Sequence, residues 1–357
     1  MQHLEHCPLC RSSSWTTRHQ FVNDLIAECS ECGLVFSSVK NIRTEIYNGD
    51  YYSGSGFGYD NYEGERKTHL LTFNRRLERA EEKLGSTGSL IDYGAAYGHL
   101  LAAGIERGWH VVGTDIAFDA VKKAKKTYGA PLFLSDFHFP VVRARLFDLA
   151  CLYDVIEHTN DPLAVLVNVS SVLNSHGLLH ITTPNVGSLS QKILQKSWYH
   201  YKPSEHLVYF SFKTLQNALE RCGYRTVELA PAPSQMTLHD IIVRLHRYAD
   251  RPIELLNRVI GHLGLADHAI NIYIGEMEAW AKVKSDVDFD ETLIVDGMDD
   301  ASVYSSLLQC GTCTGKLTLE KWPQYLSCKH CQIGYEVIDG IPIMLPSKAI
   351  RLASCAS

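Results

Sequence analysis

Eight of the eleven cysteines in this 357-residue chain stand in four C-x-x-C pairs. The pairs are Cys7/Cys10, Cys29/Cys32, Cys310/Cys313 and Cys328/Cys331. Two such pairs can place four thiolates around one ion, and a tetrahedral four-thiolate shell is the usual structural zinc site. The spacing therefore predicts two zinc ribbons, one toward each end of the chain. The alternative is a set of buried or redox-active cysteine pairs.

A closed four-thiolate shell leaves no coordination position for water, so the predicted ions stabilise structure and do not hydrolyse a substrate. Segments of about 40 residues bury little apolar surface, and metal binding then contributes free energy of folding. Cys151, Cys222 and Cys355 remain outside the pairs. Cys151 lies in an apolar run, which predicts a small core residue and not a nucleophile.

A glycine-containing loop, Asp92-Tyr93-Gly94-Ala95-Ala96-Tyr97-Gly98, follows a short apolar run and precedes a helical pattern. Small residues at the end of a strand allow the backbone to approach a ligand. A nicotinamide-binding loop would read G-x-G-x-x-G. Here three residues separate Gly94 from Gly98, and Asp92 stands two residues before the first glycine. This pattern favours a ligand with a cationic, amino-acid-like end.

Residues 88 to 284 resemble the class I S-adenosylmethionine-dependent methyltransferases, in the broad group that includes ubiquinone-pathway and deoxysugar methyltransferases. Besides the loop, the resemblance is carried in order by Asp115, Ser135-Asp136-Phe137, residues 147–158 ending in Glu157-His158, residues 173–177 and Thr183-Pro184-Asn185. The family loop commonly reads D-x-G-C/S-G-x-G, so Ala96 replaces the usual middle glycine. The resemblance implies an α/β fold with a Rossmann-like seven-stranded sheet, helices on both faces, and a small ribbon at each end.

The same resemblance implies which residues bind the methyl donor. They are Asp92, Gly94, Ala96, Gly98, Asp115, Ile116, Asp136, Phe137 and Tyr153. Asp115 matches the carboxylate that binds the ribose hydroxyls, and an ionised Asp offers two acceptor oxygens for that diol. Without the resemblance, Asp92 could be a turn residue and Asp115 a helix cap.

On the acceptor side, residues 205–211 resemble the EHL-x-x-F-S segment that lines the acceptor pocket in sugar methyltransferases. Imidazole titrates near the working pH, and an adjacent carboxylate can orient it or raise its pKa. We therefore expect His206 to be the general base and Glu205 its partner. The alternative is that both residues fix the loop onto the next helix. His138, His158 and His200 are weaker candidates, and we expect Glu157-His158 to brace the loop.

Residues 47–62 are rich in Tyr and Gly, which predicts an adaptable loop whose aromatic faces cover the sulfonium, or else a plain connector. The N-terminal ribbon resembles a module of bacterial sugar-modifying methyltransferases. Residues 310–346 resemble the zinc-ribbon activator of tRNA and release-factor methyltransferases. That activator adds a strand to its partner, so we expect the same contact within this chain. The two modules point to different acceptors.

The candidate site residues lie between predicted helices and strands that alternate along the chain. Helical patterns cover residues 66–84, 99–107, 117–128, 161–173 and 213–222, and strand patterns cover 89–92, 110–115, 131–135, 147–153, 178–183, 225–230 and 277–283. Alternation of this kind predicts a parallel sheet with its ligand site at the carboxyl ends of the strands.

We expect four regions along the chain: a zinc ribbon over 1–44, a methyltransferase domain over 45–284, an acidic linker over 285–305 and a second ribbon over 306–357. Apolar residues at helical spacing predict a helical insertion near 237–270 within the second region.

Composition restricts the partners. Hydrophobic residues make up 45% and charged residues 21%, which is typical of a folded globular protein. The net charge of −6 predicts no bulk attraction to nucleic acid or to an anionic membrane. No apolar run reaches the length of a membrane span and no signal-peptide pattern opens the chain, so we expect a cytoplasmic location.

The leading hypothesis is an S-adenosylmethionine-dependent methyltransferase that modifies an oxygen or carbon atom of a small biosynthetic intermediate, with sugars and lipid-linked molecules as candidates. One alternative is an RNA or protein methyltransferase with a built-in activator. Another is a nonenzymatic zinc-ribbon adaptor with a degenerate cofactor fold. Binding of a partner protein through the ribbons is compatible with each.

Overall fold

The computed structural model describes residues 5–22, 24–39, 62–238, 241–242, 260–266, 268–273, 275–284 and 299–352. Three predicted regions lie wholly or mostly outside the described residues: the Tyr/Gly-rich segment except Tyr62, the core of the helical insertion, and the first two thirds of the acidic linker. Within the described part, no helix combines the length and the apolar character needed to cross a membrane.

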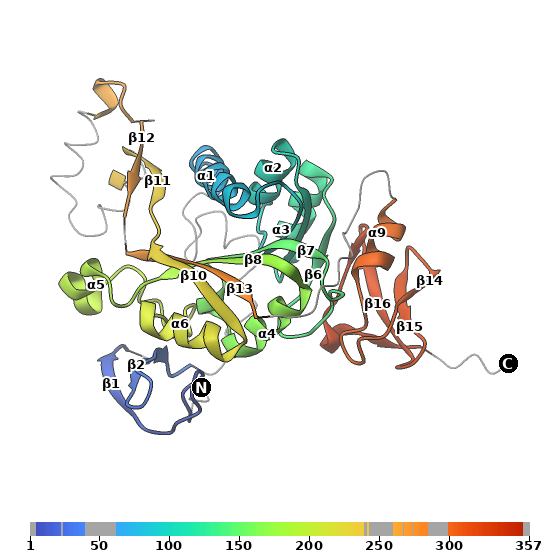
Figure 1. Ribbon diagram of the computed structural model, residues 1–357, viewed down its shortest axis with the longest axis horizontal. Helices are drawn as coiled ribbons and strands as arrows, with labels where there is room; N and C mark the ends of the chain where they lie inside the picture. The colour runs from blue at the N-terminus through green and yellow to red at the C-terminus, as the bar shows by residue number, and fades with distance from the viewer. Residues whose placement is uncertain are drawn as a thin grey trace.

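The centre of the molecule is a seven-stranded sheet of order β10-β13-β8-β7-β4-β5-β6 (Figure 1). Its strands are β4 (Ser89–Tyr93), β5 (His110–Asp115), β6 (Leu132–Leu134), β7 (Phe147–Tyr153), β8 (Leu173–Pro184), β10 (Tyr224–Pro231) and β13 (Glu276–Val283). Strands β4 to β8 pair in parallel, whereas β13 is antiparallel to both of its neighbours.

The predicted seven-stranded sheet is present, and it departs from the expected parallel pattern at β13. The physical reason is the connection. The chain leaves β10, makes an antiparallel ribbon of β11 (Ser234–Thr237) and β12 (Ala269–Ile272), and starts β13 four residues later. Because β13 starts so soon after the β11–β12 ribbon, it runs back beside β10 in the opposite direction, like the second arm of a hairpin.

Helices cover both faces of the sheet, as predicted. One core layer joins α1 (Arg66–Leu84), α2 (His99–Glu106) and α3 (Phe118–Tyr128) to alternate strand residues such as Leu90 and Leu149. The other layer joins α4 (Pro162–Val172) and α6 (Phe212–Arg221) to the residues between them, such as Ile91 and Ala150. Because successive side chains along a strand point to opposite faces of the sheet, each strand contributes to both core layers. Shorter elements are η3 (Ile156–His158), α5 (Leu189–Leu194) and η4 (Gln195–Ser197).

The N-terminal module is a sheet of order β1-β2-β3-β9, made of β1 (Trp15–Gln20), β2 (Leu25–Cys29), β3 (Val35–Ser37) and β9 (Val208–Tyr209). Its fourth strand comes from the segment predicted to line the acceptor pocket. The amide of Ser37 donates to the carbonyl oxygen of Leu207 at 2.8 Å, and the Ser37 hydroxyl donates to that of Pro203 at 2.9 Å. This sheet crosses the predicted domain boundary near residue 44.

The C-terminal module consists of α9 (Asp300–Leu307), β14 (Thr318–Lys321), β15 (Tyr325–Cys328), β16 (Ile333–Ile338), β17 (Ile341–Pro342), η5 (Pro346–Lys348) and β18 (Ile350–Arg351). It lies beside the β6 edge of the central sheet (Figure 1). Leu134 pairs in parallel with Ile343, and the Met344 amide donates to the Leu134 carbonyl at 2.8 Å. The expectation of an added strand within one chain agrees with this contact.

Helix α9 begins inside the region predicted as a solvated acidic linker, so that prediction is wrong for its last residues. Val303, Tyr304 and Leu307 are buried because they share one face of the helix. The Tyr304 hydroxyl donates to the Leu132 carbonyl oxygen at 2.8 Å and accepts from the Leu132 amide at 3.2 Å. This helix therefore fastens the module to β6.

Candidate active site

The loop between β4 and α2 has the conformation that the glycine pattern predicts. Gly94 and Gly98 have positive φ angles of 81° and 78°. The amides of Gly94 and Ala95 donate to the Thr114 carbonyl oxygen at 2.8 and 3.0 Å. A Cβ atom on Gly94 would lie 2.4 Å from Cγ2 of Val155. Gly94 is thus required both by its backbone angle and by the close approach of Val155.

Ala96 adopts a positive φ of 46° at the position where glycine is usual in the family. A left-handed conformation costs a residue with a Cβ about 1 kcal/mol. The Ala96 amide donates to Oδ2 of Asp115 at 2.8 Å, which offsets part of that cost. The replacement is therefore tolerated without loss of the turn.

Asp115 is held at the end of β5 by backbone amides. Its Oδ1 accepts from the Ala117 amide at 2.8 Å, and the Ile116 backbone also contributes a hydrogen bond. Burial raises the pKa of Asp115, while these amides lower it in part. A carboxylate oxygen can accept more than one hydrogen bond, so both oxygens of Asp115 keep capacity for a ribose diol.

Asp92 is 4% exposed and lies next to this carboxylate. Burial and the negative charge of Asp115 raise the pKa of Asp92 well above its usual range. A cation bound beside Asp92 would favour the ionised form and lower that pKa. The pair of carboxylates suits a ligand that has hydroxyls at one point and a positive charge at another, which fits S-adenosylmethionine.

Tyr62, at the end of the Tyr/Gly-rich segment, packs on this loop with Ala96 and Ala117. Its ring stacks on His99 with centroids 5.0 Å apart and meets Tyr97 edge-on at 5.4 Å. Burial raises the pKa of Tyr62 well above its usual value, and the carboxylates of Asp92, Asp115 and Asp154 raise it further. The phenol therefore lies within electrostatic range of three strand ends.

Three other residues predicted to bind the cofactor lie outside this loop. Asp136 follows β6 and accepts a hydrogen bond from the His138 amide at 3.2 Å. Phe137 is buried, and its ring meets Tyr93 edge-on at 5.5 Å. Tyr153 lies under α1, where its ring stacks on Phe73 with centroids 5.7 Å apart. Asp136 and Tyr153 are half-buried, whereas Phe137 is buried.

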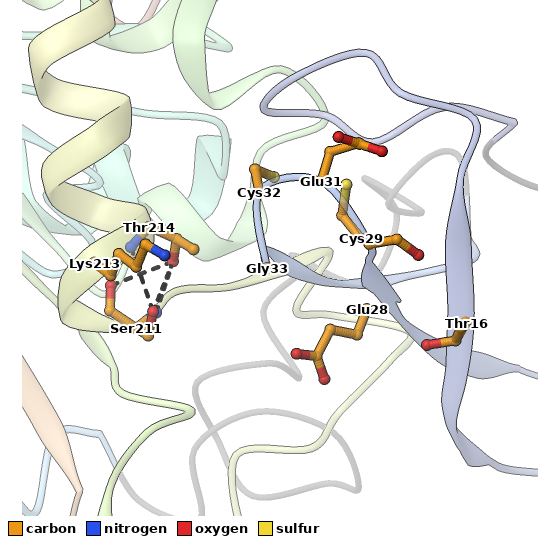
Figure 2. Close-up of a pocket in the computed structure, with 10 residues that line it drawn as sticks. Thr16, Glu28, Cys29, Glu31, Cys32, Gly33, Ser211, Lys213 and Thr214 are labelled. Atoms are coloured by element: carbon orange, nitrogen blue, oxygen red, sulfur yellow. Dashed lines mark hydrogen bonds between the residues drawn. The ribbon is translucent and has the colours of Figure 1, made fainter.

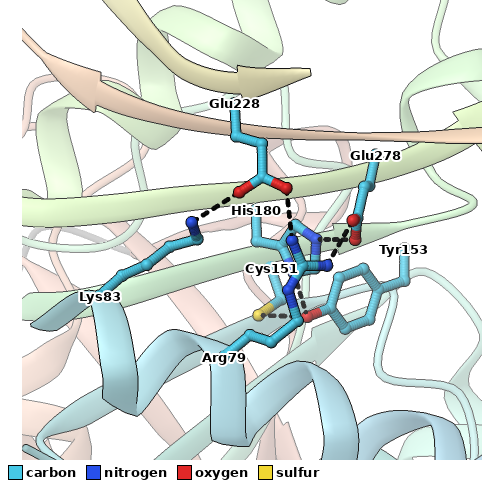
Figure 3. A network of polar contacts seen from close by, with 7 residues as sticks. All are labelled: Arg79, Lys83, Cys151, Tyr153, His180, Glu228 and Glu278. Atoms are coloured by element: carbon cyan, nitrogen blue, oxygen red, sulfur yellow. Dashed lines mark hydrogen bonds and ion pairs between the residues drawn. The ribbon is translucent and has the colours of Figure 1, made fainter. Parts of the chain in front are cut away.

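The hydroxyl of Tyr153 belongs to a buried chain of hydrogen bonds (Figure 3). Burial lowers the pKa of His180 to about 4, so its ring is neutral at pH 7. A carboxylate can only accept, so Nε2 of His180 donates to Glu278 at 3.2 Å and Nδ1 accepts from Tyr153 at 2.8 Å. Cys151, fully buried as predicted, donates to Tyr153 at 3.4 Å. Cys151 is therefore a core residue.

The acceptor side is formed by η3 and the chain that enters β9. The Leu207 amide donates to the Glu157 carbonyl oxygen at 2.7 Å. Nδ1 of His158 donates to the Glu205 carbonyl oxygen at 2.9 Å, because that oxygen can only accept. The rings of His158 and His206 meet edge-on with centroids 4.7 Å apart. The expected bracing by Glu157 and His158 agrees with these contacts.

His206 is 6% exposed. Burial lowers its pKa well below the usual value, and the neighbouring His158, Lys202 and His200 lower it further. The carboxylate of Glu205 lies 3.5 Å from the ammonium of Lys202. The expectation that Glu205 raises the pKa of His206 is wrong, because the turn closed on the Lys202 carbonyl directs the acid toward Lys202.

The weaker histidine candidates lie at different places. His200 is buried, and its ring centroid is 6.4 Å from that of His206. His138 follows Asp136 on the β6 side of the sheet, in the part of the site predicted to surround adenine. Only His200 and His158 therefore share the acceptor side with His206.

Asp154 is a site residue that the sequence analysis missed. It directly follows β7 and has a positive φ of 56°, a conformation that costs free energy in a residue with a side chain. Burial raises the pKa of Glu157 well above its usual range, and the Asp154 carboxylate raises it further. Asp154 is thus within electrostatic range of both Tyr62 and Glu157. Its place after a buried parallel strand was the available signal.

Both predicted cysteine sets come together. The sulfur–sulfur distances are 3.6 Å for Cys7–Cys32, 3.4 Å for Cys10–Cys29, 3.9 Å for Cys310–Cys331 and 3.6 Å for Cys313–Cys328. A tetrahedral zinc ion with bonds of about 2.3 Å separates its sulfur ligands by about 3.8 Å. Each set could therefore hold one metal ion.

A polar cleft separates the second knuckle of the N-terminal module from the start of α6 (Figure 2). Ser211 and Thr214 form a reciprocal capping box there, with the Ser211 amide donating to Oγ1 of Thr214 at 2.8 Å. The cleft is lined by Cys29 and Cys32 but by none of the predicted cofactor or catalytic residues. Its relevance is structural: the capping box fixes the chain directly after β9.

Comparisons with known proteins agree with this geometry. Residues 62–229 match the family described as a methyltransferase domain. A stretch of 46 residues is 44% identical to a UPF0434 protein of Methylobacillus flagellatus, covering 13% of this chain and 77% of that protein. We assign that stretch to the C-terminal module, where residues 310–346 carry the resemblance found in the sequence.

Two further similarities are weaker. A malonyl-[acyl-carrier protein] O-methyltransferase of Hamiltonella defensa is 28% identical over 130 residues, covering 36% of this chain and 49% of that protein. A chain from the complex between the Haloferax volcanii Trm112 methyltransferase activator and a methyltransferase is 14% identical with a TM-score of 0.43, covering 62% of this chain and 95% of that one. The matched region and the geometry of its loop identify residues 62–229 as an S-adenosylmethionine-dependent methyltransferase domain, in a chain that carries a four-cysteine set at each end.

Proposed function

We propose that the protein transfers a methyl group from S-adenosylmethionine to an oxygen or carbon atom of a small biosynthetic intermediate, with a sugar as the first candidate. The observation that carries this proposal is the pairing of β3 with β9. Through that pairing the N-terminal module holds His206 beside Glu157, at the carboxyl ends of β7 and β8. The acceptor would enter there, at the same sheet edge as the cofactor loop.

The methyl donor supplies an electrophilic methyl group on a positively charged sulfur. In this proposal Asp115 accepts hydrogen bonds from the ribose, and Asp92 faces the cationic end. Gly94, Ala96 and Gly98 let the backbone approach the cofactor. Ile116, Asp136 and Phe137 surround its adenine ring. Tyr153, held by its hydrogen bond to His180, forms part of the wall of the cofactor site. Tyr62 covers the loop between β4 and α2.

His206 is proposed to take the proton from the acceptor. A neutral imidazole has one nitrogen lone pair, and burial keeps the His206 ring neutral at pH 7. As the acceptor atom bonds to the methyl carbon, its proton would move to Nδ1 of His206. Glu205 would act through its backbone, since its carbonyl oxygen holds His158 against His206.

The modules have supporting roles. We propose one structural zinc ion in each four-cysteine set, which requires reduced thiols and therefore favours the cytoplasm. The net charge of −6 supports a small molecule over a polyanionic acceptor. The Hamiltonella relative is named as an O-methyltransferase, which supports transfer to oxygen.

A second candidate is methylation of an RNA or a protein. The observation that favours it is the contact of the UPF0434-like module with β6. In the activator that this module resembles, such a contact accompanies macromolecular substrates. The acceptor screen below includes peptides for that reason.

His206→Ala tests the proposal. Candidate sugars, phenols and peptides are first screened for methylated product with the wild-type protein. With an acceptor in hand, His206→Ala should lower kcat by about a hundredfold or more and leave the affinity for S-adenosylmethionine unchanged. His176→Ala, at an exposed position in β8, is the control. A variant that keeps its kcat removes His206 as the base.

A further inference from the structure

Two segments bring three metal-binding side chains to one point at the acceptor side. Glu157 and His158 come from η3, and His206 precedes β9. Their ligand atoms all lie within 4.8 Å of one another. Ligands that share one ion at about 2.0–2.2 Å lie at most about 4.4 Å apart. Small side-chain rotations would therefore bring all three onto one ion.

Glu157 is 1% exposed, yet only one of its carboxylate oxygens has a donor. Oε2 accepts from the Thr183 hydroxyl at 2.9 Å. Among the described residues, Oε1 is buried and has no hydrogen-bond partner, and no Lys or Arg forms an ion pair with Glu157. A buried carboxylate oxygen without a donor or a cation is costly. A metal ion would supply the missing positive charge.

Each imidazole offers a nitrogen within 4.8 Å of the other ligand atoms. Nδ1 of His158 donates to the Glu205 carbonyl oxygen, so Nε2 would be the nitrogen of that ring to bind the ion. A backbone carbonyl that fixes the ring in this way is the usual second partner of a metal-bound histidine. His206 bonds to the backbone of His200, and among the described residues its buried Nδ1 has no partner.

We propose that Glu157, His158 and His206 bind a divalent transition-metal ion through one carboxylate oxygen and two imidazole nitrogens. Two nitrogen ligands and one oxygen ligand select zinc, cobalt or iron over calcium and magnesium. Three protein ligands leave at least one coordination position for water or for an acceptor oxygen. This third site is separate from both four-cysteine sets.

The proposal rests on the proposed function in one respect: the ion takes the lone pair that His206 would use as a base. One lone pair cannot hold a metal ion and a proton together. Metal at this site should therefore lower kcat, and the ratio of free to metal-bound protein would regulate methyl transfer.

The test uses the full chain with both four-cysteine sets loaded with zinc, titrated with Co²⁺. We expect one further equivalent of cobalt to bind. Its spectrum should lack the sulfur-to-cobalt charge-transfer band of a thiolate site, because its ligands are nitrogen and oxygen. Glu157→Gln and His206→Ala should each weaken this binding about a hundredfold or more, whereas His200→Ala should leave it unchanged.

The outcomes separate the two proposals. Absence of a third equivalent in the wild-type protein overturns the metal site and leaves the His206→Ala test of the base intact. Cobalt bound with sulfur charge transfer also overturns it. Binding that lowers kcat supports both proposals. Binding that raises kcat supports the metal site and overturns the role of His206 as a base. The wild-type titration decides the matter even where a variant fails to fold.

Discussion

The hydroxyl of Tyr153 lies 2.8 Å from Nδ1 of His180, beneath α1 (Figure 3). His180 in turn stacks on Trp280 with ring centroids 3.6 Å apart and donates to Glu278. Arg79 pairs with both Glu278 and Glu228. His180 and Glu278, which lie behind Tyr153, are thus linked to α1 by ion pairs as well as by packing.

Glu278→Gln should lower the free energy of unfolding by about 2–3 kcal/mol. This is near the lower end of the usual cost of breaking a buried ion pair, because Arg79 keeps Glu228 as a partner. Urea unfolding at neutral pH measures this change. Glu220→Gln, on the exposed face of α6, is the control and should be close to neutral. An equal loss in both variants would contradict a role for the buried network.

The same variant predicts a pH dependence. Burial raises the pKa of Glu278, but the hydrogen bond from His180 and the Arg79 guanidinium outweigh it and lower the pKa from 4.5 to about 2. A lowered pKa adds stability above the unfolded-state value, and that stability is lost as the pH falls from about 4.5 toward 2. The difference in unfolding free energy between wild type and Glu278→Gln should shrink across that window. A constant difference would contradict the assignment.

Asp115→Ala should weaken binding of S-adenosylmethionine by about ten- to a hundredfold, since the paired hydrogen bonds to the ribose are lost. Titration calorimetry measures the affinity. Asp119→Ala, on the exposed face of α3, is a matched control. Unchanged affinity in Asp115→Ala, with an unchanged melting temperature, would remove this residue from the cofactor site.

Purified protein should retain two tightly bound zinc ions per chain after dialysis, and Cys7→Ser or Cys310→Ser should each remove one. Elemental analysis gives the ratio. Because β9 belongs to the N-terminal sheet, Cys7→Ser should also lower kcat, whereas Cys310→Ser should affect chiefly the β6 edge. A ratio near zero with free thiols would contradict both metal sites.

Tyr304→Phe should destabilise the attachment of the C-terminal module by about 1–2 kcal/mol, because the Leu132 amide and carbonyl lose their buried partner. Thermal unfolding followed by tryptophan fluorescence reports it through Trp322, whose ring centroid lies 5.9 Å from that of Tyr304. Tyr325→Phe, in β15, is the control. Equal melting curves for both variants would show that the hydroxyl of Tyr304 is dispensable.

Local patterns predicted much of this fold. The helix over Arg66–Leu84 and the strands His110–Asp115 and Phe147–Tyr153 have the predicted bounds, because the helix has a periodic apolar face and the strands are short apolar runs buried on both faces. The cysteine sets were predictable for the same reason, since both members of each knuckle lie within one turn. Gly94 and Asp115 follow from the end of a strand, where ligand-binding residues collect.

Contacts between distant segments were not predictable in this way. Strand β9 has only two residues, and its partner Val35–Ser37 lies far away in the sequence, so no periodicity reveals the pair. The direction of the Glu205 side chain depends on a turn closed by hydrogen bonds to Lys202. Oε1 of Glu157, which has no hydrogen-bond partner among the described residues, reflects the way Thr183 and His206 come together around that carboxylate from separate segments.

The junction of β6 with the C-terminal module has a consequence for assembly. In a two-protein complex the same strand pairing would depend on how much of each protein the cell makes, and dilution would dissociate it. Here one peptide chain carries both surfaces, so the encounter is intramolecular, with an effective concentration that is commonly in the millimolar range for a short flexible linker. The two parts are present in equal numbers from synthesis onward, and the edge of the sheet stays covered at any expression level.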